Sequence, residues 1–190
     1  MHINTQTRAV IVIKTSHSSQ NLHETSRFIT ASMKSQQELR EAIENTARKF
    51  LGAYKEAGEQ NDPAIINRDV TECCKRYFKP AGVLQLFGSP PVDGLSNADY
   101  EAAMALDLQK YVVTYSDISD VTVDTESRKS AATTVTGMKY KDGEEDVIEH
   151  SWVLDFNEDG SKVTKVIEFC DMDGLRRMFV KVYSDKQDSK

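Results

Sequence analysis

The sequence predicts an α+β domain, with helices in its first half and a meander of antiparallel strands in its second half. Apolar residues recur every three or four positions in the first half, as they do on one face of a helix. From about residue 115 the apolar period changes to two, which is typical of strands. Three helices would then cover one face of a curved four-stranded sheet, with either a packed core or a pocket between the layers.

The first helix is predicted over residues 35–57. Ser35 and Glu38 form a capping box, in which the two side chains satisfy backbone amides of the first turn. The apolar positions that follow have helical spacing: Leu39, Ile43, Ala47, Phe50 and Tyr54. A short second helix is expected next, with Asp62 as its N-cap and Pro63 in its first turn.

The segment between the second and third helices is predicted to be irregular. Residues 67–80 are expected to be irregular or extended, and residues 82–94, which contain GSPPVDG, are expected to form a loop. Ser96 and Asp99 cap the third helix. Its apolar positions are Tyr100, Met104, Leu108 and Tyr111.

Four strands and a last helix follow. The strands are predicted near residues 115–124, 131–140, 146–156 and 162–170. Turn-forming residues separate them, and Asp142-Gly143 is a strong hairpin signal. The last helix is predicted from about Asp173 to Tyr183, with Asp173 as its N-cap.

Both ends of the chain are polar. Residues 1–34 are rich in Ser, Thr, Gln, Asn and His and show no helical periodicity, so we expect a mostly disordered arm. A start of translation at Met33 is the alternative interpretation. The folded domain is expected over residues 35–184, and a polar tail over residues 185–190.

Composition argues against several classes of protein. A net charge of −6 gives no electrostatic footprint for nucleic acid or anionic lipid. The apolar run Ala9–Ile13 is too short for a signal-peptide core or a membrane span, so the default expectation is a cytoplasmic protein. Three cysteines and four histidines show no metal-type spacing, and we expect neither a metal nor a cofactor.

The third predicted strand indicates which face of the sheet points inward. Its more apolar face carries Ile148, His150, Trp152, Leu154 and Phe156. Glu149 lies on the opposite face. His150 is therefore a titratable group on an apolar inner face, where it is either a general base or polar anchor of a pocket, or a histidine satisfied by a neighbouring group.

Acids follow at the corner between the last strand and the last helix. Alternation sends Glu168 and Asp171 to opposite faces of that strand. Asp171 is either an exposed carboxylate or a base whose pKa is raised by apolar walls. Asp69, earlier in the chain, is either a turn former or a carboxylate at the mouth of a pocket.

These segments resemble a known superfamily. The run EHSWVLDFNEDGSKVTKVIEFCDMDGL, with the capped helix 35–57 and the stretch RDVTECCKRYFKPAG, resembles the nuclear transport factor 2-like superfamily, most of all small fungal members related to SnoaL-like polyketide cyclases. Glu149, His150 and Trp152 match its acidic-plus-aromatic penultimate strand. The resemblance covers about residues 35–184. It implies a cone-shaped α+β barrel in which three helices pack on a bent antiparallel sheet of about four strands, with homodimers formed through the outer face of the sheet.

The resemblance implies no single chemistry, because the superfamily contains both enzymes and binding modules. One hypothesis is a cofactor-independent isomerase, cyclase or dehydratase that acts on a hydrophobic small molecule of the polyketide or terpenoid type. The alternative is a non-catalytic small-molecule-binding or dimeric interaction module. The chain departs from the family in lacking the His–Asp pair of the dehydratases and in carrying a histidine where many relatives have an aromatic residue.

The candidate site follows from the enzyme hypothesis. The expected residues are Asp171 and His150 for proton transfer, and Glu149, Trp152, Tyr111, Tyr100 and Asp69 around the substrate. Helical spacing also explains Tyr100 and Tyr111 as core residues. A cavity of about 300 Å³ or more, lined by at least two of these polar side chains, would favour the enzyme over the binding module.

Overall fold

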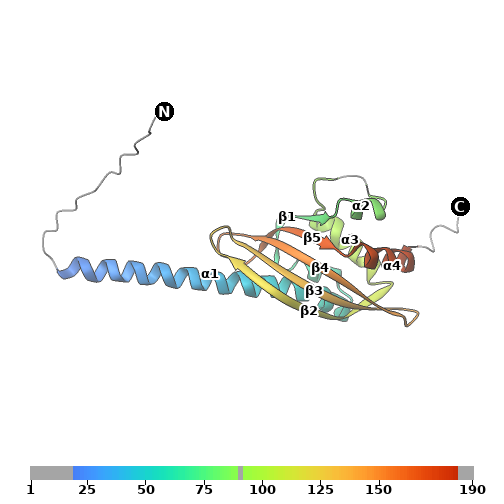
Figure 1. Cartoon of the computed structure of the whole chain (residues 1–190), viewed down its shortest axis with the longest axis horizontal. Coiled ribbons are helices and arrows are strands. Elements are labelled where there is room, and N and C mark those ends of the chain that lie inside the picture. Colours follow the sequence, from blue (N-terminus) through green and yellow to red (C-terminus); the bar gives the residue numbers. More distant parts are fainter. Residues whose placement is uncertain (1–18, 90–91, 184–190) are drawn as a thin grey trace, which may run out of the picture. The chain divides into compact units, whose positions relative to one another are not determined.

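The computed structural model describes residues 19–89 and 92–183, with side chains from residue 35 onward. The chain divides after Ser35 into two units, and the second unit holds every strand described (Figure 1). The predicted arm lies outside the described residues over positions 1–18, as does the tail over positions 185–190. Among the described helices, none is long and apolar enough to cross a membrane.

The first helix begins earlier than predicted. Helix α1 spans Ser19–Gln60, so Ser35 lies inside it and the prediction of an N-terminus there was wrong. Residues 19–34 contain neither glycine nor proline, and nothing in them stops a helix. The predicted apolar face is confirmed, because Ile43, Ala47 and Phe50 are completely buried.

Three short helices follow α1. Helix η1 spans Pro63–Asn67, and its N-cap is Asp62, whose carboxylate accepts the amide of Ala64 as predicted. Helix α2 spans Gly82–Leu86, within the segment that was predicted to be a loop. Helix α3 spans Asn97–Asp107, and the predicted capping box at its start is confirmed.

Five strands form one mixed sheet in the order β1-β5-β4-β3-β2 (Figure 1). Their bounds are β1 Val70–Lys79, β2 Tyr111–Asp124, β3 Lys129–Tyr140, β4 Glu145–Phe156 and β5 Val163–Cys170. Strands β2 to β5 pair antiparallel, as expected, whereas β1 pairs parallel with β5. The prediction of about four strands therefore lacked β1, and Tyr111 opens β2 rather than extending α3. The sheet is open, with β1 and β2 at its edges.

The last helix has a different cap from the one predicted. Helix α4 spans Met172–Tyr183. The carboxylate of Asp171 accepts the amide of Asp173 at 3.0 Å, and its carbonyl accepts the amide of Leu175 at 2.9 Å. Asp171 is thus the N-cap. Asp173 lies in the first turn and pairs with Arg176, so its prediction as the cap was wrong.

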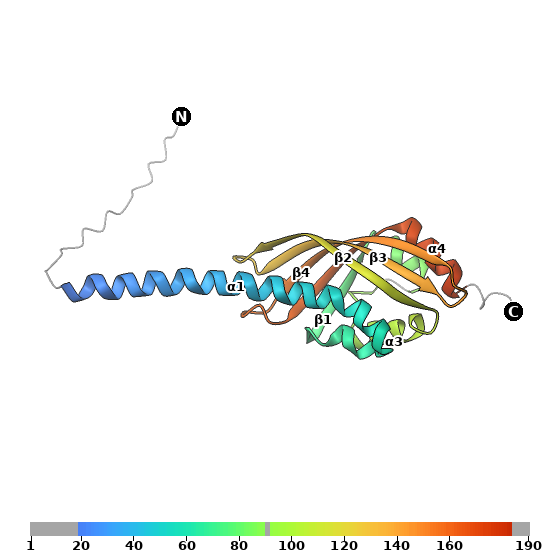
Figure 2. The ribbon, with the colours of Figure 1, turned by 90° about the horizontal axis from the view of Figure 1, so that it is seen from below.

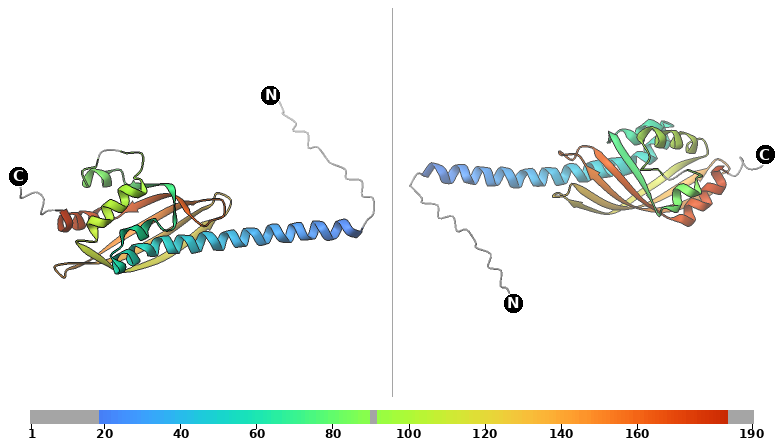
Figure 3. Two further views of the ribbon diagram at one scale, coloured as in Figure 1. Left: turned by 180° about the vertical axis from the view of Figure 1, so that it is seen from behind. Right: turned by 90° about the horizontal axis from the view of Figure 1, so that it is seen from above.

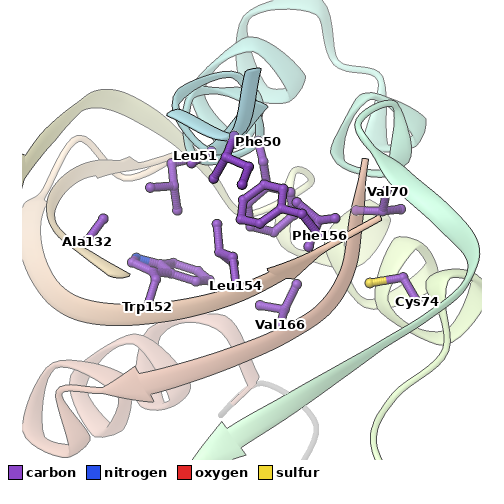
Figure 4. Close-up of a cluster of buried hydrophobic side chains, with 12 residues drawn as sticks. Phe50, Leu51, Val70, Cys74, Ala132, Trp152, Leu154, Phe156 and Val166 are labelled. Atoms are coloured by element: carbon purple, nitrogen blue, oxygen red, sulfur yellow. The ribbon is translucent and has the colours of Figure 1, made fainter. Parts of the chain in front are cut away.

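The part of α1 from residue 36 onward covers one face of the sheet (Figure 2). Phe50 and Leu51 pack there against Trp152, Leu154 and Val166 from β4 and β5 (Figure 4). Helices α2 and α4 contact each other at one end of the sheet (Figure 3). A second apolar cluster lies there. A third cluster joins α1 to η1 and α3.

The turn between β4 and β5 requires glycine at position 160. Gly160 has φ +73°, and a Cβ there would lie 2.9 Å from Cγ1 of Ile43 on α1. Its carbonyl also accepts the hydroxyl of Thr46 at 2.7 Å. We expect Gly160→Ala to lower the free energy of unfolding by about 3 kcal/mol, from backbone strain and overpacking together. Urea unfolding followed by tryptophan fluorescence measures this loss.

Gly143→Ala is the matched control. Gly143 has φ +91°, but a Cβ there would meet nothing within 4 Å. Its substitution should cost only the backbone strain, about 1 kcal/mol. Equal losses in the two variants would show that the contact with α1 does not constrain the turn.

Candidate functional site

A cavity of about 300 Å³ lies between the inner face of the sheet and the helices. Its walls are mostly aliphatic and aromatic. Among the described residues, its larger polar and titratable side chains are Tyr54, Tyr100, Asp107, Tyr111, His150, Glu168, Cys170 and Tyr183. Neither a lysine nor an arginine lines it within the described part of the chain. The cavity therefore suits an apolar ligand without negative charge.

A histidine–glutamate pair occupies one wall of the cavity. His150 on β4 and Glu168 on β5 point to the same face, because Trp152 pairs with Glu168 and His150 with Cys170 in the β4–β5 ladder. The Nε2 atom of His150 lies 3.3 Å from Oε1 of Glu168, which is 7% exposed. Nδ1 of His150 and Oε2 of Glu168 find no hydrogen-bond partner among the described residues. Each member of the pair thus has one buried polar atom that the described residues leave unsatisfied.

Burial shifts both groups toward their neutral forms. It raises the pKa of Glu168 to about 7, against the opposing effects of the Cys170 thiol and the charge of Arg76. It lowers the pKa of His150 to about 4, although the charge of Asp171 acts in the other direction. Near neutral pH the imidazole is therefore uncharged, and the carboxyl group is close to the midpoint of its titration. Such a group can both take up and release a proton.

Two tyrosines and a buried arginine lie near this pair. The hydroxyl of Tyr100 donates to that of Tyr54 at 3.2 Å. The guanidinium of Arg76, 1% exposed, lies 4.3 Å from the centre of the Tyr100 ring. Burial is the main cause, and the charge of Glu168 a further one, of a raised pKa at both phenols. Both therefore stay protonated. Because Tyr100 already donates its single O–H to Tyr54, only Tyr54 has an O–H left to donate into the cavity.

Four of the seven residues predicted from the sequence line the cavity. These are His150, Trp152, Tyr100 and Tyr111. The prediction that β4 turns this face inward is confirmed, and the indole of Trp152 donates to the hydroxyl of Thr134 at 2.9 Å. Their roles toward a substrate stay predictions.

The other three predicted residues lie outside the cavity lining. Asp171 caps α4. Glu149 is exposed on the opposite face of the sheet. Asp69 precedes β1 and pairs with Arg68 at 3.2 Å. The positions of Asp69 and Asp171 are thus explained by local interactions, an ion pair for Asp69 and hydrogen bonds for Asp171.

Sequence reasoning did not assign Glu168, Tyr54 or Asp107 to the site. Alternation along β5 could have found Glu168, because it shares a face with the buried Val166. Tyr54 belongs to the apolar face of α1, and its hydroxyl carries no separate signal. Asp107 ends a helix, and nothing local distinguishes it from an exposed acid.

His150, Glu168 and Cys170 are also the described residues closest to a metal-binding arrangement. Their ligand atoms all lie within 4.8 Å of one another. A thiol binds metal as the thiolate, and burial, followed by the nearby Glu168, raises the pKa of Cys170 far above its usual value. The donor set therefore fits an acid–base pair better than a metal centre.

Solved structures provide the comparison, since no protein-family model and no curated protein matches the sequence. The BvnE pinacolase from Penicillium brevicompactum is 21% identical, with a TM-score of 0.59 over 80% of this chain and 94% of its own. PrhC from Penicillium brasilianum is 18% identical, with a TM-score of 0.61 over 78% and 92%. AusH from Aspergillus nidulans is 17% identical, with a TM-score of 0.57 over 70% and 86%.

These matches extend over most of each chain. At such identities the likeness concerns the fold alone. The chain has the nuclear transport factor 2-like fold of the SnoaL-like type, as its sequence resemblance implied.

Proposed function

We propose that the protein is a cofactor-independent enzyme that moves a proton on a hydrophobic small molecule, as an isomerase, cyclase or dehydratase does. The observation that carries this proposal is the His150–Glu168 pair, buried in the wall of an apolar cavity with one unpaired polar atom on each residue. Water has little room beside a ligand in such a site, so a carboxylate there is a stronger base than in solution.

The geometry supports a division of roles. Nε2 of neutral His150 lies 3.3 Å from Oε1 of Glu168 and restrains the carboxylate by this contact, leaving Oε2 for the substrate. Glu168 then takes a proton from the carbon beside a carbonyl group. The electrons of the broken C–H bond move to the carbonyl oxygen, and Tyr54 donates a hydrogen bond to the resulting enolate. Where a C=C bond adjoins the deprotonated carbon, the negative charge extends to the far carbon of that bond. Protonated Glu168 returns the proton there, which shifts the double bond and completes an isomerisation.

One structural neighbour supports an enzymatic role, since BvnE is described as a pinacolase. The cavity volume of about 300 Å³ is large enough for a small-molecule ligand. The predicted homodimer stays a proposal; Val112 and Tyr115 on β2 and Phe169 on β5 are exposed apolar side chains of the sheet.

A proton-transfer probe tests the proposal without knowledge of the natural substrate. In 5-nitrobenzisoxazole, removal of one C–H proton opens the ring and forms a coloured phenolate. We expect the protein to accelerate this reaction over acetate, with a rate that rises with pH through an apparent pKa near 7, as expected for Glu168. Glu168→Gln should lower kcat/KM at least tenfold, because general bases contribute about a hundredfold or more.

Two further carboxylates serve as comparisons. Glu149→Gln alters an exposed acid on the outer face of β4, away from the cavity. This substitution should leave the rate of ring opening unchanged. Asp171→Asn should leave it within about threefold, a change too small for loss of a general base. A large loss in Asp171→Asn with none in Glu168→Gln would identify Asp171 as the base instead. No acceleration by the unaltered protein would favour the non-catalytic binding module.

A further inference from the structure

A second carboxylate in the cavity takes no part in the proposed proton transfer. Asp107 is the last residue of α3 and lies in the cavity wall. The hydroxyl of Tyr183 donates to its Oδ1 at 2.8 Å, and the hydroxyl of Tyr111 donates to its Oδ2 at 3.3 Å. A carboxylate has about four acceptor positions, so these two bonds leave each oxygen able to accept another.

Asp107 occupies an unfavourable place for an acid. The free carbonyl groups at the end of α3 carry partial negative charge, which repels a carboxylate. Burial also raises the pKa of Asp107 to about 6, while the two phenols act against that shift. The ion pairs among the described residues include none with Asp107. At neutral pH this wall therefore carries negative charge that no described cation neutralises.

Aromatic rings surround the same end of the cavity. Phe87 makes edge contacts with Phe179 and Tyr183, at ring-centre distances of 5.7 and 5.8 Å. Phe179 and Tyr183 stack at 5.2 Å. All three line the cavity. A carboxylate bordered by aromatic faces is the arrangement that binds an ammonium group, through an ion pair and cation–π attraction together.

This acidic end is separate from the His150–Glu168 pair. Tyr111 pairs with Tyr140 in the sheet, whereas His150 pairs with Thr134. These two positions on β3 are six residues apart, which is about 20 Å along a strand. Side chains reach into the cavity from both ends, so one elongated ligand can contact both.

We propose that the cavity binds a hydrophobic molecule that carries a protonated amine, and that the amine lies against Asp107 among Phe87, Phe179 and Tyr183. The inference deepens the proposed function, because it assigns a charge and an orientation to the substrate of the same cavity. The amine is held at the α4 end, and the reacting carbon lies toward Glu168. The absence of lysine and arginine from the described lining disfavours phosphorylated or carboxylate ligands by the same electrostatics.

Two probes of the same shape test this directly. 1-Adamantanemethylamine and 1-adamantanemethanol share one hydrocarbon cage and differ in an ammonium or a hydroxyl group. Trp152, the single tryptophan of the chain, lines the cavity and reports binding of either by fluorescence at pH 7.5. We expect the unaltered protein to bind the amine at least tenfold more tightly than the alcohol, as a charge-assisted hydrogen bond provides.

Variants locate the preference within the cavity. Asp107→Asn should reduce the ratio of the two affinities to about one while affinity for the alcohol stays within about twofold, which also shows that the variant folds. Asp173→Asn, an exposed acid on α4, should keep the preference. Glu168→Gln should keep it too. Loss of the preference in Glu168→Gln, or its retention in Asp107→Asn, would overturn the assignment to Asp107.

The probes also separate this inference from the proposed function. Binding of both compounds with equal affinity to the unaltered protein would overturn the amine assignment and leave the proton-transfer proposal standing. Failure of both compounds to bind would show that the cavity does not admit apolar ligands, and would contradict both proposals.

Discussion

Glu168→Gln is expected to change the free energy of unfolding differently at acid and alkaline pH. Relative to the unaltered protein, the variant should be about 3 kcal/mol more favourable at alkaline pH than at pH 4. Burial raises the pKa of Glu168 from 4.5 to about 7. The folded state therefore holds this proton up to about pH 7, whereas the unfolded chain releases it near pH 4.5. A shift of about 2.5 units corresponds to about 3 kcal/mol, because one unit is 1.36 kcal/mol.

The sign follows from the protons bound in each state. Between pH 4.5 and 7 the folded state binds more protons than the unfolded state, so the unaltered protein loses stability as pH rises. Below pH 4.5 the group is protonated in both states and its contribution is fully present. Glutamine cannot ionise, so the variant lacks this slope. His150 titrates in both proteins with a slope of the opposite sign, because burial lowers its pKa.

Urea unfolding at pH 4, 6 and 8.5 measures the difference, with the fluorescence of buried Trp152 as the signal. Glu149→Gln removes an exposed carboxylate from the neighbouring strand and should follow the unaltered protein at every pH. A difference between Glu168→Gln and the unaltered protein that does not change with pH would show that the folded state does not hold a proton on Glu168.

Arg76→Ala is expected to lower the free energy of unfolding by about 3 kcal/mol. The Arg76 guanidinium donates to Oδ1 of Asn67 at 3.1 Å, to Oδ1 of Asn97 at 3.4 Å and to the carbonyl of Ile66 at 2.9 Å. It also lies over the ring of Tyr100. Truncation leaves a cavity and deprives one buried and two partly buried acceptors of their donor, and both effects destabilise the fold.

Arg76→Met separates the two effects. Methionine fills much of the volume and removes a buried charge, but it donates no hydrogen bond, so we expect a loss of about 1–2 kcal/mol. Arg48→Ala, which breaks an exposed pair with Glu44 on α1, should change stability by at most about 0.5 kcal/mol. The bonds from Arg76 on β1 reach acceptors on η1 and α3. Equal free energies of unfolding for Arg76→Ala and Arg48→Ala would show that these bonds do not stabilise the fold.

The strands that local patterns determine were predicted well. Period-two alternation and the Asp142-Gly143 turn located β3 and β4 within about two residues of their ends, because both signals lie within the segments themselves. Strand β1 lacked such a signal. A register shift between Val70 and Lys75 interrupts its alternation, and its partner β5 is about 90 residues away along the chain.

The candidate site divides in the same way. Alternation along β4 predicted that His150 and Trp152 face the interior, and the cavity confirms it. The contact between His150 and Glu168 was not predicted, because it depends on the register between β4 and β5. The bond from Tyr183 to Asp107 joins residues 76 positions apart and depends on how α4 packs against the end of α3.

The sequence by itself determined the class of fold, the order of its later strands and the face of β4 that is buried, since each follows from the spacing of apolar residues over one element. The tertiary structure decided which acids share the cavity. Asp171 was the sequence's candidate base and became a helix cap, whereas Glu168 and Asp107 became the cavity's two carboxylates. Strand register and helix packing bring such groups together, and both are set by contacts between residues far apart in the chain.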